Sequence, residues 1–160
     1  MTRSRKAGAA TLEFAIIGTV FVSLLALALD AAWQIVIEAA LDAGGRAASR
    51  FGTTGSTVPT GMTPVPLNRT DSILQIVIHN SGGLLQADRL VISETSYASF
   101  TVIASGGAGT AGPGSAGQVV RYSFTYTQPY LTPIAMALTH SAQIVHRLTV
   151  TVVNEPFPSS

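Results

Sequence analysis

Cysteine is absent from this 160-residue chain, and lysine occurs only once, at Lys6. The lack of cysteine excludes a disulfide framework, a thiol nucleophile, cysteine-ligated metals and a lipid anchor on cysteine. The lack of any later lysine removes the residue that phosphate-binding loops and Schiff-base enzymes require. Charged residues make up 11% of the chain and hydrophobic residues 47%, a high apolar share for a purely soluble protein.

No basic residue occurs between Lys6 and Arg46, whereas Arg3, Arg5 and Lys6 precede an uncharged run over residues 14–29. This asymmetry predicts a cytoplasmic N-terminus and an exported C-terminal region. The run is shorter than the ~20 apolar residues that a bilayer requires. Residues 31–37 extend it past the lone Asp30, so we predict a single span over about residues 14–37, with Trp33 as an interfacial anchor.

Glu13 stands alone just ahead of this run. A carboxylate at the edge of a membrane helix is costly unless it is neutralised, which makes Glu13 a functional candidate. The alternative is a surface acid favoured by the positive end of a helix. Small and polar residues within and just after the run favour packing against other membrane helices, although a plain lipid-facing anchor is the simpler interpretation. They are Gly18, Ser23, Ala26 and Asp30.

Residues 9–52 contain no proline and predict one long helix, weakened only at Gly44 and Gly45. In its second half, polar residues recur every four positions from Gln34 to Arg50, which is typical of a helix packed on a domain. Asp42 and Arg46 have the spacing of an ion pair within a helix. Residues 53–69 are rich in glycine, proline, serine and threonine and are predicted to form a linker or surface loop.

Residues 70–160 predict an α+β domain. Thr70 is the expected N-cap of a short helix that ends before Gly82. Residues 133–140 predict a helical turn, and residues 105–117 a glycine-rich flexible excursion. We expect an antiparallel sheet of three or four strands at residues 90–96, 99–104, 118–127 and 148–153, with residues 99–104 as a possible partner of the first strand.

Motifs for catalysis or cofactor binding are weak throughout. Residues 107–112 match the dinucleotide-binding pattern G-x-G-x-x-G, but Pro113 follows and no acid appears until Glu155, so we interpret them as a loop. The three histidines lack the spacing of a metal site. Removing the residues before Ala9 leaves six basic and eight acidic residues, a net charge of −2, which argues against nucleic-acid binding. We predict no catalytic residue, metal or cofactor.

The segment Gly8-Ala9-Ala10-Thr11-Leu12-Glu13-Phe14 resembles a type IV prepilin processing site. Residues 40–52, the strand at residues 119–126 and the ending Val-Val-Asn-Glu-Pro-Phe at residues 152–157 extend the resemblance over most of the chain. The chain is most similar to the TadE-like minor pilins, or pseudopilins, of tight-adherence (Flp, type IVb) pilus systems. Major Flp pilins place tyrosine after the acid, whereas this chain has Phe14, which favours the minor-pilin interpretation.

The resemblance implies a leader over residues 1–8 that prepilin peptidase removes between Gly8 and Ala9. The new α-amine of Ala9 would pair with Glu13 of a neighbouring subunit. Implied partners are this peptidase, other Tad pilins and pseudopilins, the inner-membrane assembly platform and membrane lipid. The implied location is the bacterial inner membrane, with the exported domain in the periplasm or the pilus. The implied role is assembly of a pilus for adhesion, biofilm formation or DNA uptake.

Two alternatives remain open from the sequence. Ala26-Leu27-Ala28 is also a signal-peptidase site, and cleavage there would release a soluble binding domain that begins at Leu29. The acid at Glu13 and the smooth helical pattern across the cut argue against it. The other alternative is an uncleaved single-pass membrane sensor or assembly factor.

Overall fold

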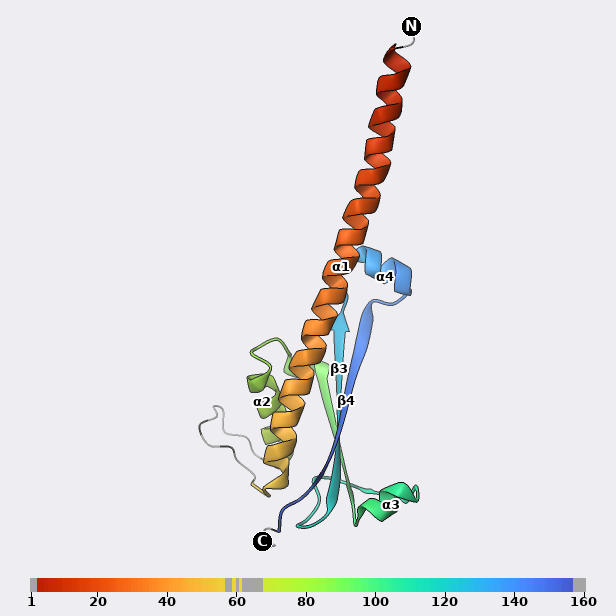
Figure 1. Ribbon diagram of the computed structural model, residues 1–160. Helices are drawn as coiled ribbons and strands as arrows, with labels where there is room; N and C mark the ends of the chain where they lie inside the picture. The colour runs from red at the N-terminus through yellow and green to blue at the C-terminus, as the bar shows by residue number, and fades with distance from the viewer. Residues whose placement is uncertain (1–2, 57–58, 60, 62–67, 157–160) are drawn as a thin grey trace. The chain divides into compact units, whose positions relative to one another are not determined.

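The computed structural model describes residues 3–56, 59, 61 and 68–156, with side chains from residue 8 onward. The chain divides into two compact units. The helical unit comprises Met1–Ile35 and Pro129–Ile144, and the sheet unit comprises Val36–Gln128 and Val145–Ser160. Helix α1 (Arg3–Thr53) contributes residues to both. The expected α+β class is confirmed (Figure 1).

The sheet is antiparallel and four-stranded, in the order β2-β1-β3-β4. The strands are β1 (Leu90–Tyr97), β2 (Thr110–Ala111), β3 (Val119–Pro129) and β4 (Gln143–Val153). Strands β1 and β3 pair with Leu90 opposite Tyr126 and Tyr97 opposite Val119. Every second residue of β3 from Val120 to Gln128 is buried, while the intervening residues are half-exposed, so one face of the sheet forms the core.

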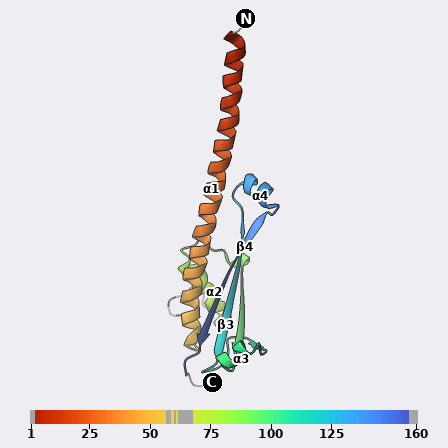
Figure 2. The ribbon, with the colours of Figure 1, turned by 45° about the vertical axis from the view of Figure 1, so that its right-hand side comes forward.

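In the sheet unit, the C-terminal part of α1 and helix α2 (Arg69–Asn80) lie on the same side of the sheet (Figure 2). Close packing explains Gly44 and Gly45, which the sequence suggested only as weak points of the helix. A Cβ atom on Gly44 would lie 2.7 Å from the Val77 carbonyl oxygen, and one on Gly45 would collide with Leu148. The fully buried core side chains are Ile37, Leu41, Ile73, Val77, Val120, Tyr122, Phe124 and Tyr126.

The helix predicted after residue 70 is present as α2, but its N-cap is Asn68 rather than Thr70. The Asn68 side chain accepts a hydrogen bond from the backbone N–H of Asp71 at 2.8 Å. The Thr70 hydroxyl instead bonds the Glu94 carboxylate on β1 at 3.3 Å. Both residue types are good caps, asparagine being the better one, and the Thr70 side chain is engaged elsewhere. Within the predicted linker, residues 57, 58, 60 and 62–67 lie outside the described residues.

The strand predicted at residues 99–104 is wrong, because Phe100–Ala104 forms helix α3. Strand β3 pairs with β1 along its whole length on one side, and on the other side β2 pairs with Thr95 and Ser96, the end of β1 nearest to residues 99–104. Strand β2 comes instead from the glycine-rich segment expected to be a flexible excursion. The final strand also begins earlier than expected, at Gln143.

The helical unit contains the N-terminal part of α1 and helix α4 (Pro133–Thr139), which confirms the helical turn predicted there. Large apolar side chains of α1 are exposed all round the helix, among them Phe14 at 78% and Ile17 at 67%. Asp30 is the first fully buried residue among the described side chains of α1, at 2% exposure. An apolar helix without a buried face needs an apolar environment outside the chain.

We expect Gly44→Ala to lower the unfolding free energy of the full-length protein by about 1–3 kcal/mol, because the new methyl group overpacks the α1–α2 contact. Gly18→Ala is the matched control, since an added Cβ there meets no atom within 4 Å and alanine is the better helix former. Chemical unfolding in mild detergent, followed by circular dichroism, measures both. Equal stability of the two variants would contradict the close packing assigned to Gly44.

Candidate functional site

The residues of the expected processing and pairing site lie on consecutive turns of α1. Gly8, Ala9, Glu13 and Phe14 are all exposed. Within the described part of the chain, Glu13 forms no ion pair. The structure therefore leaves its carboxylate accessible to a group outside this chain, in a stretch with no buried residue.

The small residues expected to mediate helix packing are less exposed than their neighbours, and a Cβ atom added at Gly18 would meet no atom within 4 Å. Gly18, Ser23 and Ala26 are half-exposed. The Ser23 hydroxyl donates a 2.8 Å hydrogen bond to the Thr19 carbonyl oxygen, so its polarity is satisfied within the helix. No contact between these residues and another helix is observed within the described chain, so the packing prediction stays a prediction.

Asp30 has a different environment from these small residues. One carboxylate oxygen accepts from the backbone N–H of Leu131 at 2.6 Å, and the other accepts from the N–H and hydroxyl of Thr132 at 3.0 and 2.5 Å. Thr132 is the N-cap of α4, since its hydroxyl accepts from the Ala135 N–H at 3.3 Å. Asp30 therefore fastens the start of α4 to α1, a role that its isolated position in the sequence did not reveal.

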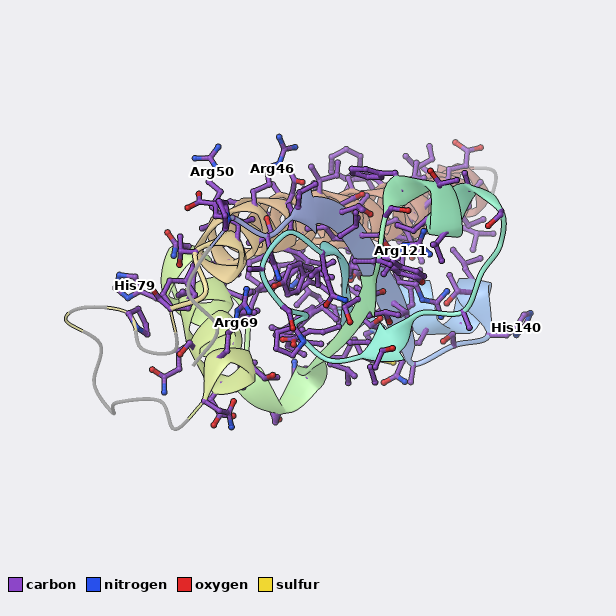
Figure 3. All side chains as sticks on the ribbon, turned by 90° about the horizontal axis from the view of Figure 1, so that it is seen from below. Arg46, Arg50, Arg69, His79, Arg121 and His140 are labelled. Atoms are coloured by element: carbon purple, nitrogen blue, oxygen red, sulfur yellow. The ribbon has the colours of Figure 1, made fainter. Side chains whose placement is uncertain are left out.

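A second polar cluster lies buried in the sheet unit around Asn154, which is 2% exposed. Its side-chain amide donates to the carbonyl oxygens of Pro113 and Ser115 at 2.9 and 3.0 Å. Its side-chain oxygen accepts from the Arg69 guanidinium at 3.3 Å. Figure 3 shows Arg69 directed into the unit, whereas Arg46 and Arg50 project outward from α1. Asn154 thus ties the end of β4 to α2 and to the glycine-rich loop.

Next to Arg69, two further ionisable side chains are buried. Burial raises the pKa of the Glu94 carboxyl, against the opposing effects of its hydrogen bond from Thr70 and the charge of Arg69. Burial likewise raises the pKa of Tyr122 to about 12. The Tyr122 hydroxyl is enclosed beside Gly52 and has no hydrogen-bond partner among the described residues. The cluster lacks a nucleophile paired with a base, so its geometry supports a structural role.

The remaining sequence candidates lie apart from one another in the described part of the chain, or have structural contacts. In the described residues, no group of three histidine, aspartate or glutamate side chains could hold a metal ion. His146 is buried, which lowers its pKa against the opposing charge of Glu38. The G-x-G-x-x-G match opens no helix, and the loop predicted there is only partly present, because Thr110 and Ala111 form β2. The predicted Asp42–Arg46 ion pair is present at 2.5 Å.

Helix α1 is long and apolar enough to cross a membrane over part of residues Gly8–Thr53. Its most apolar window has no buried residue. The end of the predicted span at residue 37 is different, because Ile37 is 0% exposed and belongs to the core of the sheet unit.

No protein-family model, no curated protein and no solved structure matches this chain.

We expect Asn154→Ala to cost about 2–4 kcal/mol of unfolding free energy, because it leaves two carbonyl oxygens and a guanidinium N–H without their partner. Asn80→Ala is the control: Asn80 is exposed and its amide bonds only the Ile76 carbonyl oxygen within α2. Chemical unfolding and amide hydrogen exchange of residues 114–118 measure the effect. A loss below about 0.5 kcal/mol with unchanged exchange would contradict the role given to Asn154.

Glu94→Gln is expected to change the pH dependence of stability. Because the folded pKa of Glu94 is raised from 4.5, the folded state binds a proton more readily than the unfolded state. That contribution to stability is complete below about pH 4.5 and is lost as the pH rises through the folded pKa. The stability of Glu94→Gln relative to the unmodified protein should therefore increase from pH 4.5 to pH 7, measured by urea unfolding.

The exposed Glu155→Gln variant serves as the control for this pH comparison. The difference between the two variants isolates the effect of burying the Glu94 carboxyl. If unfolding free energy changes with pH in the same way for Glu94→Gln and for the unmodified protein, the folded-state pKa of Glu94 is not raised.

Proposed function

We propose that this chain is a TadE-like minor pilin or pseudopilin that is anchored in the bacterial inner membrane by α1 and processed by prepilin peptidase after Gly8. The main support is the change of environment along one continuous helix. Its apolar N-terminal part is exposed, and its C-terminal part is buried in the sheet unit. Gly8 and Glu13 stand at the start of the exposed part, where the resemblance requires them.

The lengths support a lipid-facing segment that ends near Leu29 rather than at residue 37. Residues 8–29 comprise 22 positions, which measure about 33 Å in an α-helix. The hydrocarbon core of a bilayer is about 30 Å thick. Residues Asp30 and Ile37 are already buried in protein. In the proposed topology the basic residues before Gly8 stay in the cytoplasm and the sheet unit is exported.

Glu13 is the proposed assembly residue. Cleavage between Gly8 and Ala9 creates an α-amine that is mostly protonated at neutral pH. A carboxylate in or beside lipid is stabilised most effectively by an opposite charge, and Glu13 forms no ion pair within the described chain. The amine of a neighbouring pilin or pseudopilin fits this need, and Phe14 and the small residues along α1 would pack beside it.

The sheet unit is proposed to act through contacts rather than catalysis. Its buried Arg69 and Asn154 side chains hold α2, β4 and the glycine-rich loop together. The proposed partners are other Tad pilins and pseudopilins and the inner-membrane assembly platform. The proposed process is initiation, capping or regulation of a Flp pilus for adhesion or biofilm formation.

A second candidate is a soluble domain released by signal peptidase after Ala28. One observation favours it: the buried residues of α1 begin at Asp30, so a product starting at Leu29 would keep all of them. This candidate leaves Glu13 without a role.

We expect Glu13→Ala to reduce recovery of the protein in sheared pili, or with co-purified pilins and assembly platform, by several-fold. Membrane insertion should be unaffected, because the apolar run is intact. Glu155→Ala, which removes an exposed acid from the sheet unit, should assemble normally. Quantitative immunoblots of the native bacterium measure both variants. Normal assembly of Glu13→Ala would refute the pairing role.

A further inference from the structure

The helical unit carries a second apolar surface, separate from α1, on α4 and the residue before its N-cap. Leu131 is 54% and Leu138 63% exposed, while Ile134 and Met136 are half-exposed. Only Ala135 of this helix is buried. No aspartate, glutamate, lysine or arginine occurs between Arg121 and Arg147, so the helix presents apolar side chains without charged neighbours in sequence.

Asp30 fixes where this surface lies within the helical unit. Its carboxylate holds the backbone N–H groups of Leu131 and Thr132 at 2.6 and 3.0 Å. Asp30 directly follows Leu29, the last exposed apolar residue of the run, which is 59% exposed. Helix α4 therefore begins beside the end of the apolar run of α1, and both views show the two helices next to one another (Figures 1 and 2).

We propose that α4 rests on the outer surface of the bilayer, with Leu131 and Leu138 inserted among the lipid headgroups and upper acyl chains. This inference rests on the proposed membrane anchoring of α1. If the run ends at the hydrocarbon boundary near Leu29, the start of α4 falls in the interfacial layer, which is roughly 5–7 Å thick on each side of a bilayer. An uncharged helix with exposed leucines at both ends suits that layer.

The same arrangement accounts for an acid immediately after the apolar run. Asp30 satisfies two backbone N–H groups and a hydroxyl at the start of α4, groups that would be costly to leave unbonded near lipid. The carboxylate is itself shielded, at 2% exposure. Through these hydrogen bonds Asp30 keeps α4 at the membrane surface. Helix α4 in turn limits how deeply α1 can insert into the bilayer.

Depth-dependent quenching in vesicles tests this inference, and the absence of cysteine allows a single label to be placed at will. The full-length protein is reconstituted in phosphatidylglycerol and phosphatidylethanolamine vesicles. An environment-sensitive fluorophore is attached to Leu138→Cys. Phe21→Cys, within the apolar run, is the reference for the lipid interior. Thr151→Cys, exposed on β4, is the reference for water. Lipids spin-labelled near the headgroup or near the chain end act as quenchers.

The label at residue 138 should be quenched several-fold more by the headgroup-proximal spin label than by the deep one, whereas Thr151→Cys should be quenched by neither. Asp30→Ala should lower quenching at residue 138 and leave that at residue 21 unchanged. If residue 138 behaves like residue 151 while residue 21 is quenched, the inference is wrong and membrane anchoring stands. If residue 21 is also unquenched, the proposed anchoring fails as well.

A blue-shifted but unquenched label at residue 138, dependent on the protein-to-lipid ratio, would mean that α4 contacts a second copy of the chain. That result would also overturn the lipid assignment.

Discussion

The exposed apolar surface of α1 limits the environments in which this protein can be stable. Ten large apolar side chains between Leu12 and Leu29 are more than half exposed. Burying each would gain about 1.5–3 kcal/mol, so together they outweigh the ~5–15 kcal/mol that stabilises a typical domain. The helix is long and apolar enough to cross a membrane, and lipid or other apolar helices would cover this surface. Beyond that surface, Asp30 fastens α4, and glycines at positions 44, 45 and 52 allow α1 to pack closely in the sheet unit.

Much of the fold was predictable, because local patterns carry it. Local sequence favours three of the elements. Alternating residues favour strand β3, the absence of proline favours the long helix α1, and Thr132 followed by Pro133 favours the start of α4. Residues 100–104 form α3 despite their β-branched composition, and the end of β1 beside them pairs with β2 instead. Asn68 rather than Thr70 caps α2, and the Thr70 side chain bonds Glu94 from a distant part of the chain.

Some candidate site residues could be recognised from the sequence, whereas others became clear only from the structure. Glu13 and Gly8 stand out in the sequence because a charge beside an apolar run is costly. The contact of Asp30 with Thr132 joins residues 102 positions apart, and that of Asn154 with Arg69 joins residues 85 positions apart. Single-sequence patterns record near neighbours, so neither partner could be named in advance. Asp30 was expected to take part in helix packing, and its hydrogen bonds to the start of α4 emerged only from the structure.

We propose a processed, membrane-anchored pilin-like protein, and the intact mass and N-terminal sequence of the protein recovered from its native membrane test this proposal. A first residue at Ala9 is the predicted result, since it requires a cut after Gly8 with α1 retained. A first residue at Leu29 would contradict the account, because it would identify a released soluble domain and leave Glu13 outside the mature protein.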